Sequence, residues 1–267
     1  MLIDLLKTAK EKNFAIGAFN AGGLESLRAI AGAAKKLESP IIVEVSPGEE
    51  KYLGLQNFSS LVNNLKEEYG VEIFLNLDHG EDINIITNAI ELGFDLVHFD
   101  GSKLPFEENI RLCQEVVTMA HSKGVLVEGE MDQIGKKITD PSLAKKFVEE
   151  TGVDIFAVSI GNKHGMGEDE KLDLERLQEI NTVLPETFFS LHGGSGVAPE
   201  DVAAAIKLGI VKINVNTELR IAYRETLENV LRGDPEEMAM YKLLPPVIEA
   251  VEKVVEEKIL LFGSSQN

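Results

Sequence analysis

The feature that most constrains this chain is a repeated alternation of short β-rich runs with amphipathic helical stretches. The alternation spans most of the 267 residues, and its connections are too short to contain a linker between domains. A doubly wound open sheet is the alternative, but it rarely needs eight consecutive parallel strands of this regularity. We therefore predict an α/β fold of the (β/α)8 TIM-barrel type. The predicted strands cover residues 14–20, 40–46, 71–78, 95–102, 125–131, 154–161, 187–194 and 210–217.

The chain continues beyond the eighth strand-helix unit. Residues 235–262 are predicted to form a C-terminal helical extension, because the apolar spacing after Pro245 and Pro246 is that of at least one more helix. This helix could pack on the barrel or on a second subunit. We expect residues 1–267 to form one domain.

Charge excludes several classes of partner. The net charge is -19, with the acidic residues spread over the whole chain. Such a surface repels nucleic acid and anionic lipid, and an anionic substrate would need a locally positive site. No apolar run reaches the roughly 20 residues of a membrane span, and the N-terminal stretch lacks a secretory pattern, so we expect a cytoplasmic protein. The single Cys113 lies in a helical pattern and is expected in the core.

Every predicted strand ends in polar residues. In a (β/α)8 barrel, the chemistry is carried at the C-terminal ends of the strands and in the loops that follow. We therefore predict one site at this end of the barrel, with Asn20 and Ser46 among its substrate-binding residues. The polar residues are Asn20, Ser46, Asp78, His79, Asp100, Ser102, Glu128, Glu130, His164, His192 and Asn214.

Three of the five histidines, His79, His164 and His192, fall at strand ends, and each is followed by glycine. One such histidine alone would more often be a structural turn residue. Three at the same end of a barrel indicate a catalytic zinc site with an open fourth position. His98 and His121 lack this context and are interpreted as structural.

The pair Asp78–His79 poses a geometric problem, because neighbouring strand residues point to opposite faces. We expect the strand to end between them and Gly80 to let the chain turn, so that both serve one site.

The run "LHGGSGVAPEDV" has the features of an anion-binding loop. Gly193, Gly194 and Ser195 offer backbone N–H groups and a hydroxyl, and a helix starting near Pro199 adds a positive dipole end. Asn214, Asn216 and Thr217 follow from the next strand. Together they predict a phosphate cradle, which binds an anion without a basic surface.

At this point the sequence resembles a known family. The blocks "AFNAGGLES", "VEVSPGEEKYLG", "NLDHG", "FDGSKLPFEENI", "VEGE", "LHGGSG" and "GIVKINVNTEL" are similar, in order over nearly the whole chain, to those of class II, metal-dependent ketose-bisphosphate aldolases. The resemblance implies reversible aldol cleavage of a ketose 1,6-bisphosphate, most simply fructose 1,6-bisphosphate, to dihydroxyacetone phosphate and glyceraldehyde 3-phosphate. It also implies a homodimer or homotetramer.

The resemblance assigns a role to each motif residue. His79, His164 and His192 would hold the catalytic zinc, and Asp78 would exchange the proton of the substrate's C4 hydroxyl. Asp100 and Glu130 would mark a second or alternate divalent metal position. The positions expected to bind the ketone-bearing triose phosphate and a monovalent cation, Na⁺ or K⁺, are Gly165, Gly193, Gly194, Ser195, Asn214, Val215, Asn216 and Thr217.

Two loops depart from the family pattern. The stretch "EGEMDQIGKKITDP" is short and lacks the Gly-Gly-x-Glu-Asp element whose acid handles the proton on the enediolate carbon; Asp132 is the nearest acid. The stretch "HGMGEDEK" lacks the usual tyrosine and lysine, for which Lys163 or Lys171 could substitute. Both loops would close over the substrate, so the departures leave the substrate open.

Three functional hypotheses follow. The first is an aldolase for fructose 1,6-bisphosphate, with tagatose 1,6-bisphosphate or another phosphorylated ketose as rivals. The second is a zinc hydrolase on the same barrel, which generally needs a carboxylated lysine or further histidine ligands. The third is a metal-binding relative with reduced turnover. The intact Asp78 argues against the third, because a pure binder has no use for a proton-transfer acid beside its metal.

Overall fold

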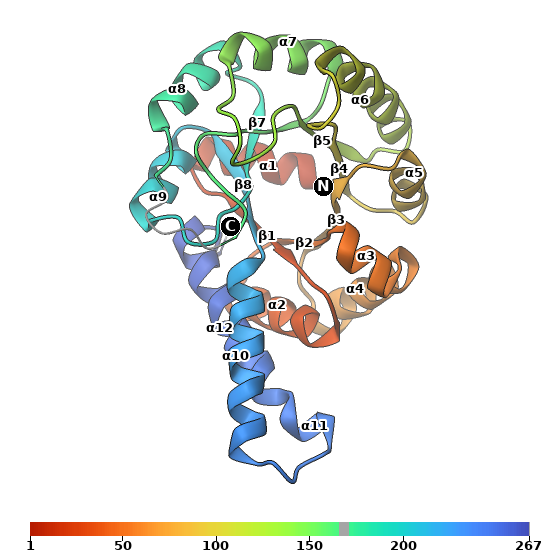
Figure 1. Cartoon of the computed structure of the whole chain (residues 1–267), viewed down its shortest axis with the longest axis vertical. Helices are drawn as coiled ribbons and strands as arrows, with labels where there is room; N and C mark the ends of the chain where they lie inside the picture. The colour runs from red at the N-terminus through yellow and green to blue at the C-terminus, as the bar shows by residue number, and fades with distance from the viewer. Residues whose placement is uncertain (166–170, 267) are drawn as a thin grey trace.

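The eight strands form a closed barrel in sequence order, and every neighbouring pair is parallel. This computed structural model describes residues 1–165 and 171–266. The predicted (β/α)8 barrel is confirmed (Figure 1). The strands are β1 (Ile16–Asn20), β2 (Ile41–Val45), β3 (Ile73–Gly80), β4 (Leu96–Asp100), β5 (Leu126–Glu130), β6 (Ile155–Ala157), β7 (Phe188–Leu191) and β8 (Ile210–Val215).

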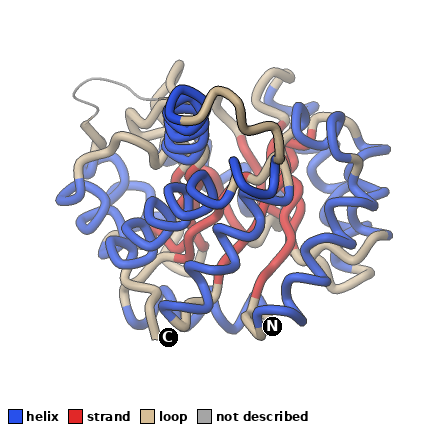
Figure 2. Tube along the Cα trace, turned by 90° about the horizontal axis from the view of Figure 1, so that it is seen from below, coloured by secondary structure: helices blue, strands red, loops and turns tan. Residues whose placement is uncertain are grey.

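Helices surround the barrel on its outside (Figure 2). An additional helix precedes the first strand, and a further pair follows the last unit. The helices are α1 (Leu2–Lys12), α2 (Leu24–Leu37), α3 (Pro47–Leu53), α4 (Leu55–Tyr69), α5 (Ile83–Glu91), α6 (Phe106–His121), α7 (Pro141–Thr151), α8 (Leu174–Val183), α9 (Pro199–Lys207), α10 (Thr217–Gly233), α11 (Met240–Leu243) and α12 (Pro245–Phe262). Among the described residues, no helix is long and apolar enough to cross a membrane.

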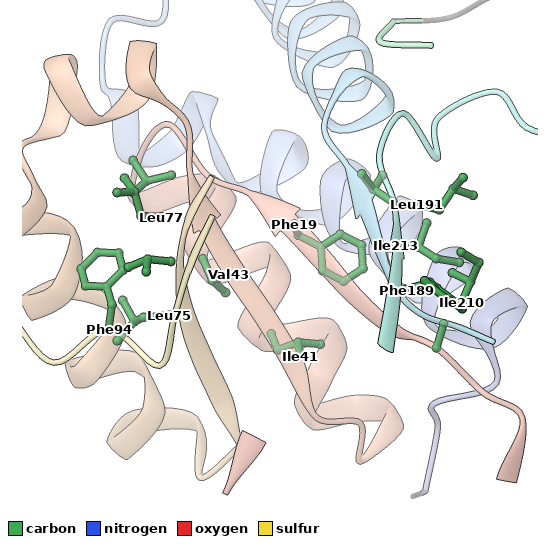
Figure 3. Packing of buried hydrophobic residues seen from close by; sticks show 14 of the residues in the cluster. Phe19, Ile41, Val43, Leu75, Leu77, Phe94, Phe189, Leu191, Ile210 and Ile213 are labelled. Atoms are coloured by element: carbon green, nitrogen blue, oxygen red, sulfur yellow. The ribbon is translucent and has the colours of Figure 1, made fainter. Parts of the chain in front are cut away.

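The main hydrophobic core lies between the outer face of the strands and the helices. Phe19, Val43, Leu75 and Phe189 are almost fully buried there (Figure 3). They belong to a cluster that also contains buried side chains of the helices. Cys113 of α6 lies in the same cluster, as expected for a core residue. Because the strand period is two, burial of these outward residues directs their neighbours into the barrel.

The barrel interior changes character from bottom to top. At the N-terminal end, an apolar layer that includes Ile16, Ile42 and Phe74 is closed from below by α1 through Leu2 and Leu6. The next layer is polar, whereas the interior of such barrels is usually filled by branched apolar residues. Its buried members are Glu44, Asn76, His98, Glu128, Ser190 and Lys212. The site described below lies on top of this polar layer.

The C-terminal extension forms an arm that projects from the barrel. α10, α11 and α12 extend away from the strands in Figure 1, and α12 packs along α2 and α10. The sequence left open whether the last helix would lie on the barrel or on another subunit. In this chain its apolar side, including Val247, Val251 and Val255, is buried within the same molecule.

The sixth strand is shorter than predicted. β6 ends at Ala157, whereas the apolar pattern continues to Gly161. Beyond Ala157 the chain leaves the barrel, because Ser159 bonds to the loop after β5: its N–H donates to Thr139 Oγ1 and its Oγ to the carbonyl of Lys137. Val158 and Ile160 are nevertheless buried in the main core, which explains why the apolar pattern continues beyond the end of the strand.

Candidate active site

A cavity of about 220 Å³ opens at the C-terminal end of the barrel. Most of the predicted site residues meet there. Exceptions are Val215, which points outward into the core, and Asp100, Glu130 and Gly194, which lie beside the cavity without lining it. The lining residues are Asn20, Ser46, Asp78, His79, His164, Gly165, His192, Gly193, Ser195, Asn214, Asn216, Thr217 and Arg220.

At the end of β3, the neighbouring side chains of Asp78 and His79 reach one site, although the backbone conformation there differs from the expected one. The strand does not end between Asp78 and His79; it continues to Gly80, with a register shift against β4 between Leu77 and Gly80. His79 itself is left-handed, with φ 50°, whereas Gly80 is not. A bulge of this kind re-aims a side chain without ending the strand. Gly80 is needed for a different reason, since a Cβ there would lie 2.9 Å from the carbonyl oxygen of His98.

His79 and His192 face each other across the site. His79 Nε2 lies 3.1 Å from His192 Nδ1. The outer nitrogen of each ring is bonded to a carboxylate: His79 Nδ1 to Asp100 Oδ2 at 2.8 Å, and His192 Nε2 to Glu128 Oε1 at 2.6 Å. These carboxylates fix the tautomers, so that the facing nitrogens carry lone pairs when both rings are neutral.

Two facing lone pairs need a cation between them. A proton on either ring can fill this role. Burial lowers the pKa of His79, but Asp78, Asp100 and Glu130 raise it to about 10 overall. Burial lowers the pKa of His192 to about 3. A divalent ion can take the place of that proton, because imidazole nitrogens oriented by carboxylates are the usual surroundings of a protein-bound metal. The donor set therefore fits a metal ion.

His164 lies at the rim of this cluster. Its ring centroid is 5.1 Å from that of His79 and 6.2 Å from that of His192, and its side chain is exposed. Within residues 1–165 and 171–266, two groups have ligand atoms that all lie within 4.8 Å of one another: Asp78 with His79, His98 and His192, and His79 with Asp100 and Glu130. Two of the three predicted zinc ligands thus lie together, and the third stands beside them.

Asp100 and Glu130 lie behind His79. Asp100 orients the imidazole through Oδ2 and accepts from the N–H and Oγ of Ser102 through Oδ1. Glu130 Oε2 lies 3.6 Å from His79 Nδ1 and has no hydrogen-bond partner among the described residues. Burial raises the pKa of Glu130 to about 7. A buried carboxylate oxygen without a donor is where a cation would be favourable.

His98, interpreted from the sequence as structural, lies within the cluster. Its Nδ1 accepts the backbone N–H of His79 at 3.1 Å, which supports the β3 bulge. Its ring contacts those of His79 and His192. Its Nε2 lies 3.6 Å from Glu130 Oε2 and has no hydrogen-bond partner in the part of the chain that the structure describes. His98 precedes Asp100 by two residues and therefore points to the same inward face of the strand. This spacing was the sequence signal for its place in the site. His121 lies on the surface and pairs with Asp154.

The carboxylate of Asp78 is held by amides on both sides. Asn20 Nδ2 donates to Oδ2 at 3.1 Å, and Asn214 Nδ2 donates to Oδ1 at 3.2 Å. Burial would raise the pKa of Asp78, but the nearby histidines hold it well below its usual range. Asp78 is thus an ionised, fixed acceptor at the cavity wall.

Ser46 and Arg220 meet through Glu49. Ser46 and Glu49 form a capping box at the start of α3, in which the N–H and Oγ of Ser46 donate to Glu49 Oε2. Arg220 of α10 donates to Glu49 Oε1 at 2.8 Å. Arg220 was not identified from the sequence, although it follows Thr217 by three residues and so lies on the same side of that helix.

The predicted phosphate cradle is formed in part. Gly193 and Ser195 line the cavity, but the N–H of Gly194 already donates to the carbonyl of Asn214. The helix that begins at the cavity is α10, through Asn216 and Thr217, and not α9 as expected. A helix N-terminus favours an anion in either case.

The loops that depart from the family pattern also have definite positions. Asp132 is buried, pairs with Lys137 at 2.8 Å, and lines a neighbouring cavity of about 430 Å³. Lys163 and Lys171 are exposed and do not line the site cavity. Residues 166–170, where the rest of the second departure falls, lie outside the described residues.

Comparison with known protein sequences gives matches over the full length. A model of the family described as fructose-bisphosphate aldolase class-II matches residues 1–267. The fructose-bisphosphate aldolase of Streptococcus pneumoniae is 38% identical over 281 residues, which cover 97% of this chain and 96% of that protein. The fructose-bisphosphate aldolase of Streptococcus pyogenes serotype M1 is 37% identical over 282 residues, with the same coverage of 97% and 96%.

A solved structure also matches this chain over its full length. The crystal structure of the YdjI aldolase from Escherichia coli K12 matches with a TM-score of 0.90 at 34% sequence identity. The match covers 100% of this chain and 98% of that one, so it includes the C-terminal arm.

Proposed function

Because this chain belongs to the class II fructose-bisphosphate aldolase family, we propose that it reversibly cleaves fructose 1,6-bisphosphate to dihydroxyacetone phosphate and glyceraldehyde 3-phosphate. The enzymes of this family are metal-dependent aldehyde-lyases that act on phosphorylated sugars. Tagatose 1,6-bisphosphate and other phosphorylated ketoses are the alternative substrates. The observation that carries the proposal is the position of the doubly held Asp78 carboxylate beside the facing nitrogens of His79 and His192.

We assign the metal to zinc, held by His79, His164 and His192. When bound, the ion supplies a Lewis acid for the ketone oxygen, worth several kcal/mol as negative charge develops on the ketone half. Asp100 and Glu128 orient the two inner imidazoles through their outer nitrogens. A second divalent ion near Asp100 and Glu130, and a monovalent cation near the phosphate, complete this assignment.

Asp78 is the proposed proton-transfer residue. In cleavage its carboxylate accepts the proton of the C4 hydroxyl, the C3–C4 bond breaks, and the electron pair stays on the ketone half, which takes up a proton at C3 to become dihydroxyacetone phosphate. In condensation it returns the proton. Asn20 and Asn214 hold the two carboxylate oxygens, so the acceptor is oriented before the substrate arrives.

The substrate's ketone-side phosphate is assigned to the loop after β7 and the start of α10. Gly193, Ser195, Asn216 and Thr217 line this part of the cavity together with Gly165. Backbone N–H groups and a helix N-terminus favour an anion in a chain whose net charge is -19. Among the described residues, Arg220 is the one arginine or lysine that lines the cavity.

We also propose that the chain assembles as a homodimer or homotetramer through the arm of α10, α11 and α12. Large apolar side chains stand exposed along it: Leu231 at 45%, Met240 at 55% and Tyr241 at 79%. Exposed apolar side chains gathered in one region are typical of surfaces that bind another protein.

The test is turnover of the fructose, tagatose and sorbose 1,6-bisphosphates, followed by release of triose phosphate. Protein loaded with zinc and the same protein after chelation are compared. We expect cleavage of at least one bisphosphate, loss of activity on chelation and recovery when zinc is returned.

Each outcome separates the hypotheses. No cleavage of any ketose phosphate by zinc-loaded protein would favour a metal-binding relative with reduced turnover. Cleavage that survives complete chelation would contradict the metal assignment. Preference for the tagatose compound would keep the reaction and change the substrate.

A further inference from the structure

Beneath the site lies a lysine for which the proposed reaction has no assigned use. Lys212 of β8 is fully buried and does not line the cavity. Its Nζ lies 2.6 Å from Asn214 Oδ1, 3.0 Å from Glu128 Oε2 and 3.4 Å from Glu44 Oε2. Burying a cation is costly unless it is paired, and here the pairing reaches residues that contact the site.

The contact with Asn214 determines which way the carboxamide points. An ammonium group has donors and no acceptor, so the amide oxygen must face Lys212. The amide nitrogen then faces the other way, where it donates to Asp78 Oδ1 at 3.2 Å. With the amide reversed, Lys212 and the amide nitrogen would meet donor to donor, and the carbonyl oxygen would face a carboxylate.

The contact with Glu128 leads to the second part of the site. Glu128 Oε1 accepts from Ser190 Oγ and from His192 Nε2, while Oε2 lies by Lys212. Lys212 therefore contacts one residue that holds Asp78 and another that holds His192.

The same contacts exclude a nucleophilic role. An imine-forming lysine must lose its proton and reach the substrate's carbonyl carbon. Burial would lower the pKa of Lys212, but Glu128 and Glu44 raise it above its ordinary value. The ammonium also has no exposed surface, so it stays charged and out of reach.

We propose that Lys212 is a positioning residue for aldol cleavage, which fixes the Asn214 carboxamide so that its N–H holds the Asp78 carboxylate toward the substrate hydroxyl. This inference rests on the proposed function for its kinetic consequence. The orientation of the Asn214 carboxamide, in contrast, can be tested whether or not the protein turns over a substrate.

A double-mutant cycle tests the route through Asn214. Lys212→Met keeps an unbranched side chain, one heavy atom shorter, and removes the donor. Asn214→Ala removes the residue through which Lys212 would act on Asp78. We expect Lys212→Met to lower kcat about 10- to 100-fold, with KM changed less than about threefold and zinc content unchanged. The double variant should be no slower than Asn214→Ala alone. The proposal is overturned if the losses of kcat in the two single variants multiply in the double variant. It is also overturned if Lys212→Met loses zinc and saturating zinc restores both the zinc content and kcat.

A structural measurement keeps the test independent of the reaction. Crystal structures of the wild type and Lys212→Met are compared at the Asn214 amide. We expect the contact between Asn214 Nδ2 and Asp78 to lengthen beyond hydrogen-bond distance in the variant, and an unchanged contact would contradict the proposal. If the wild type cleaves no ketose phosphate, the proposed function fails while this comparison still decides the inference.

A second variant tests whether Lys212→Met lowers activity only because it destabilises the fold. Lys212→Met leaves Glu128 buried with less compensation, and Glu44 as well where it is ionised. The same measurements are therefore made on Lys212→Met with Glu44→Gln, in which one of these two carboxyl groups can no longer ionise. Lys207→Met, on the exposed side of α9, is the matched lysine substitution and should keep wild-type kinetics.

Discussion

Asp78 is the residue on which the proposed chemistry depends. Both of its carboxylate oxygens accept amide hydrogens, and its nearest ionisable neighbours are the imidazoles of the cluster. The amides of Asn20 and Asn214 therefore orient the carboxylate, and they do not compete with it for the proton of the substrate's hydroxyl. We therefore expect Asp78 to transfer protons and to contribute little to holding the metal.

Asp78→Ala should separate these two tasks. We expect kcat to fall at least about 10²-fold, since general acid–base groups contribute this much or more, while zinc content stays at the wild-type level. Steady-state kinetics and metal analysis measure the two. Glu81→Gln, an exposed carboxylate substitution at the end of the same strand, is the control and should change neither. Loss of zinc in Asp78→Ala would show that the carboxylate belongs to the metal site.

The buried carboxyl group of Glu44 makes the stability of the folded protein depend on pH. Burial, followed by the nearby charge of Asp78, raises its pKa to about 8 from the usual 4.5. The folded state therefore holds a proton that the unfolded state releases between these two values. This contribution to stability is complete below about pH 4.5 and is lost as the pH rises to about 8.

Glu44→Gln should remove this dependence, because the amide mimics the protonated acid. We expect the variant to gain stability relative to the wild type as the pH rises from 5 to 8.5, by roughly 2–5 kcal/mol at most. Urea unfolding at several pH values measures the difference. Glu72→Gln, an exposed substitution, should run parallel to the wild type. A constant difference between Glu44→Gln and the wild type would show that Glu44 is ionised throughout.

At the scale of the elements, two loops touch where the site is completed. The loop after β6, which carries His164, approaches the loop after β7 at Gly193. Gly193 has φ 66°, and a Cβ there would lie 1.9 Å from the carbonyl oxygen of Lys163. Only glycine permits this approach, so Gly193 helps to place His164 beside His192 as well as lining the cavity.

Gly193→Ala should therefore weaken the metal site. We expect a lower melting temperature, consistent with a left-handed alanine costing about 1–2 kcal/mol, and weaker zinc binding because the His164 loop is displaced. Calorimetry and competition with a chromogenic chelator measure these effects. Gly48→Ala, inside α3 with no atom within 4 Å of the added Cβ, should be neutral or slightly stabilising. Wild-type zinc affinity in Gly193→Ala would contradict this role.

At the scale of the whole molecule, the arm carries several large apolar side chains that are exposed to solvent. α12 buries one side on α2 and α10, while Leu231, Met238 and Tyr241 remain exposed along the arm. Their exposed fractions of 45%, 83% and 79% are high for large apolar side chains, which supports the proposed self-association.

Sedimentation should find an oligomer larger than the 29.3 kDa chain. We expect Leu231→Glu combined with Tyr241→Glu to shift the population toward the monomer, because carboxylates would be buried in the contact. Leu143→Glu, an exposed leucine substitution on α7, is the control. A monomeric wild type would overturn the proposed assembly.

The barrel could be predicted from the sequence because its signal is repeated. Each strand-helix unit carries its own periodicity, and an error at one boundary, such as the end of β6, does not change the fold. The candidate site was predictable to the extent that it lies at strand ends. Thus Asp78, His79 and His192 were found, whereas Arg220, on the first turn of α10, was missed.

The sequence by itself determined the fold class, the end of the barrel that carries the site, and most of its polar residues, because these depend on local periodicity and on topology. Only the tertiary structure decided which side chains touch across the barrel. The β3 bulge that turns His79 inward, the Asp100 and Glu128 carboxylates behind the imidazoles, and the link from Lys212 to Asp78 depend on register between strands far apart in the chain. A period of two places residues on a face, but the closure of the barrel determines which of them meet.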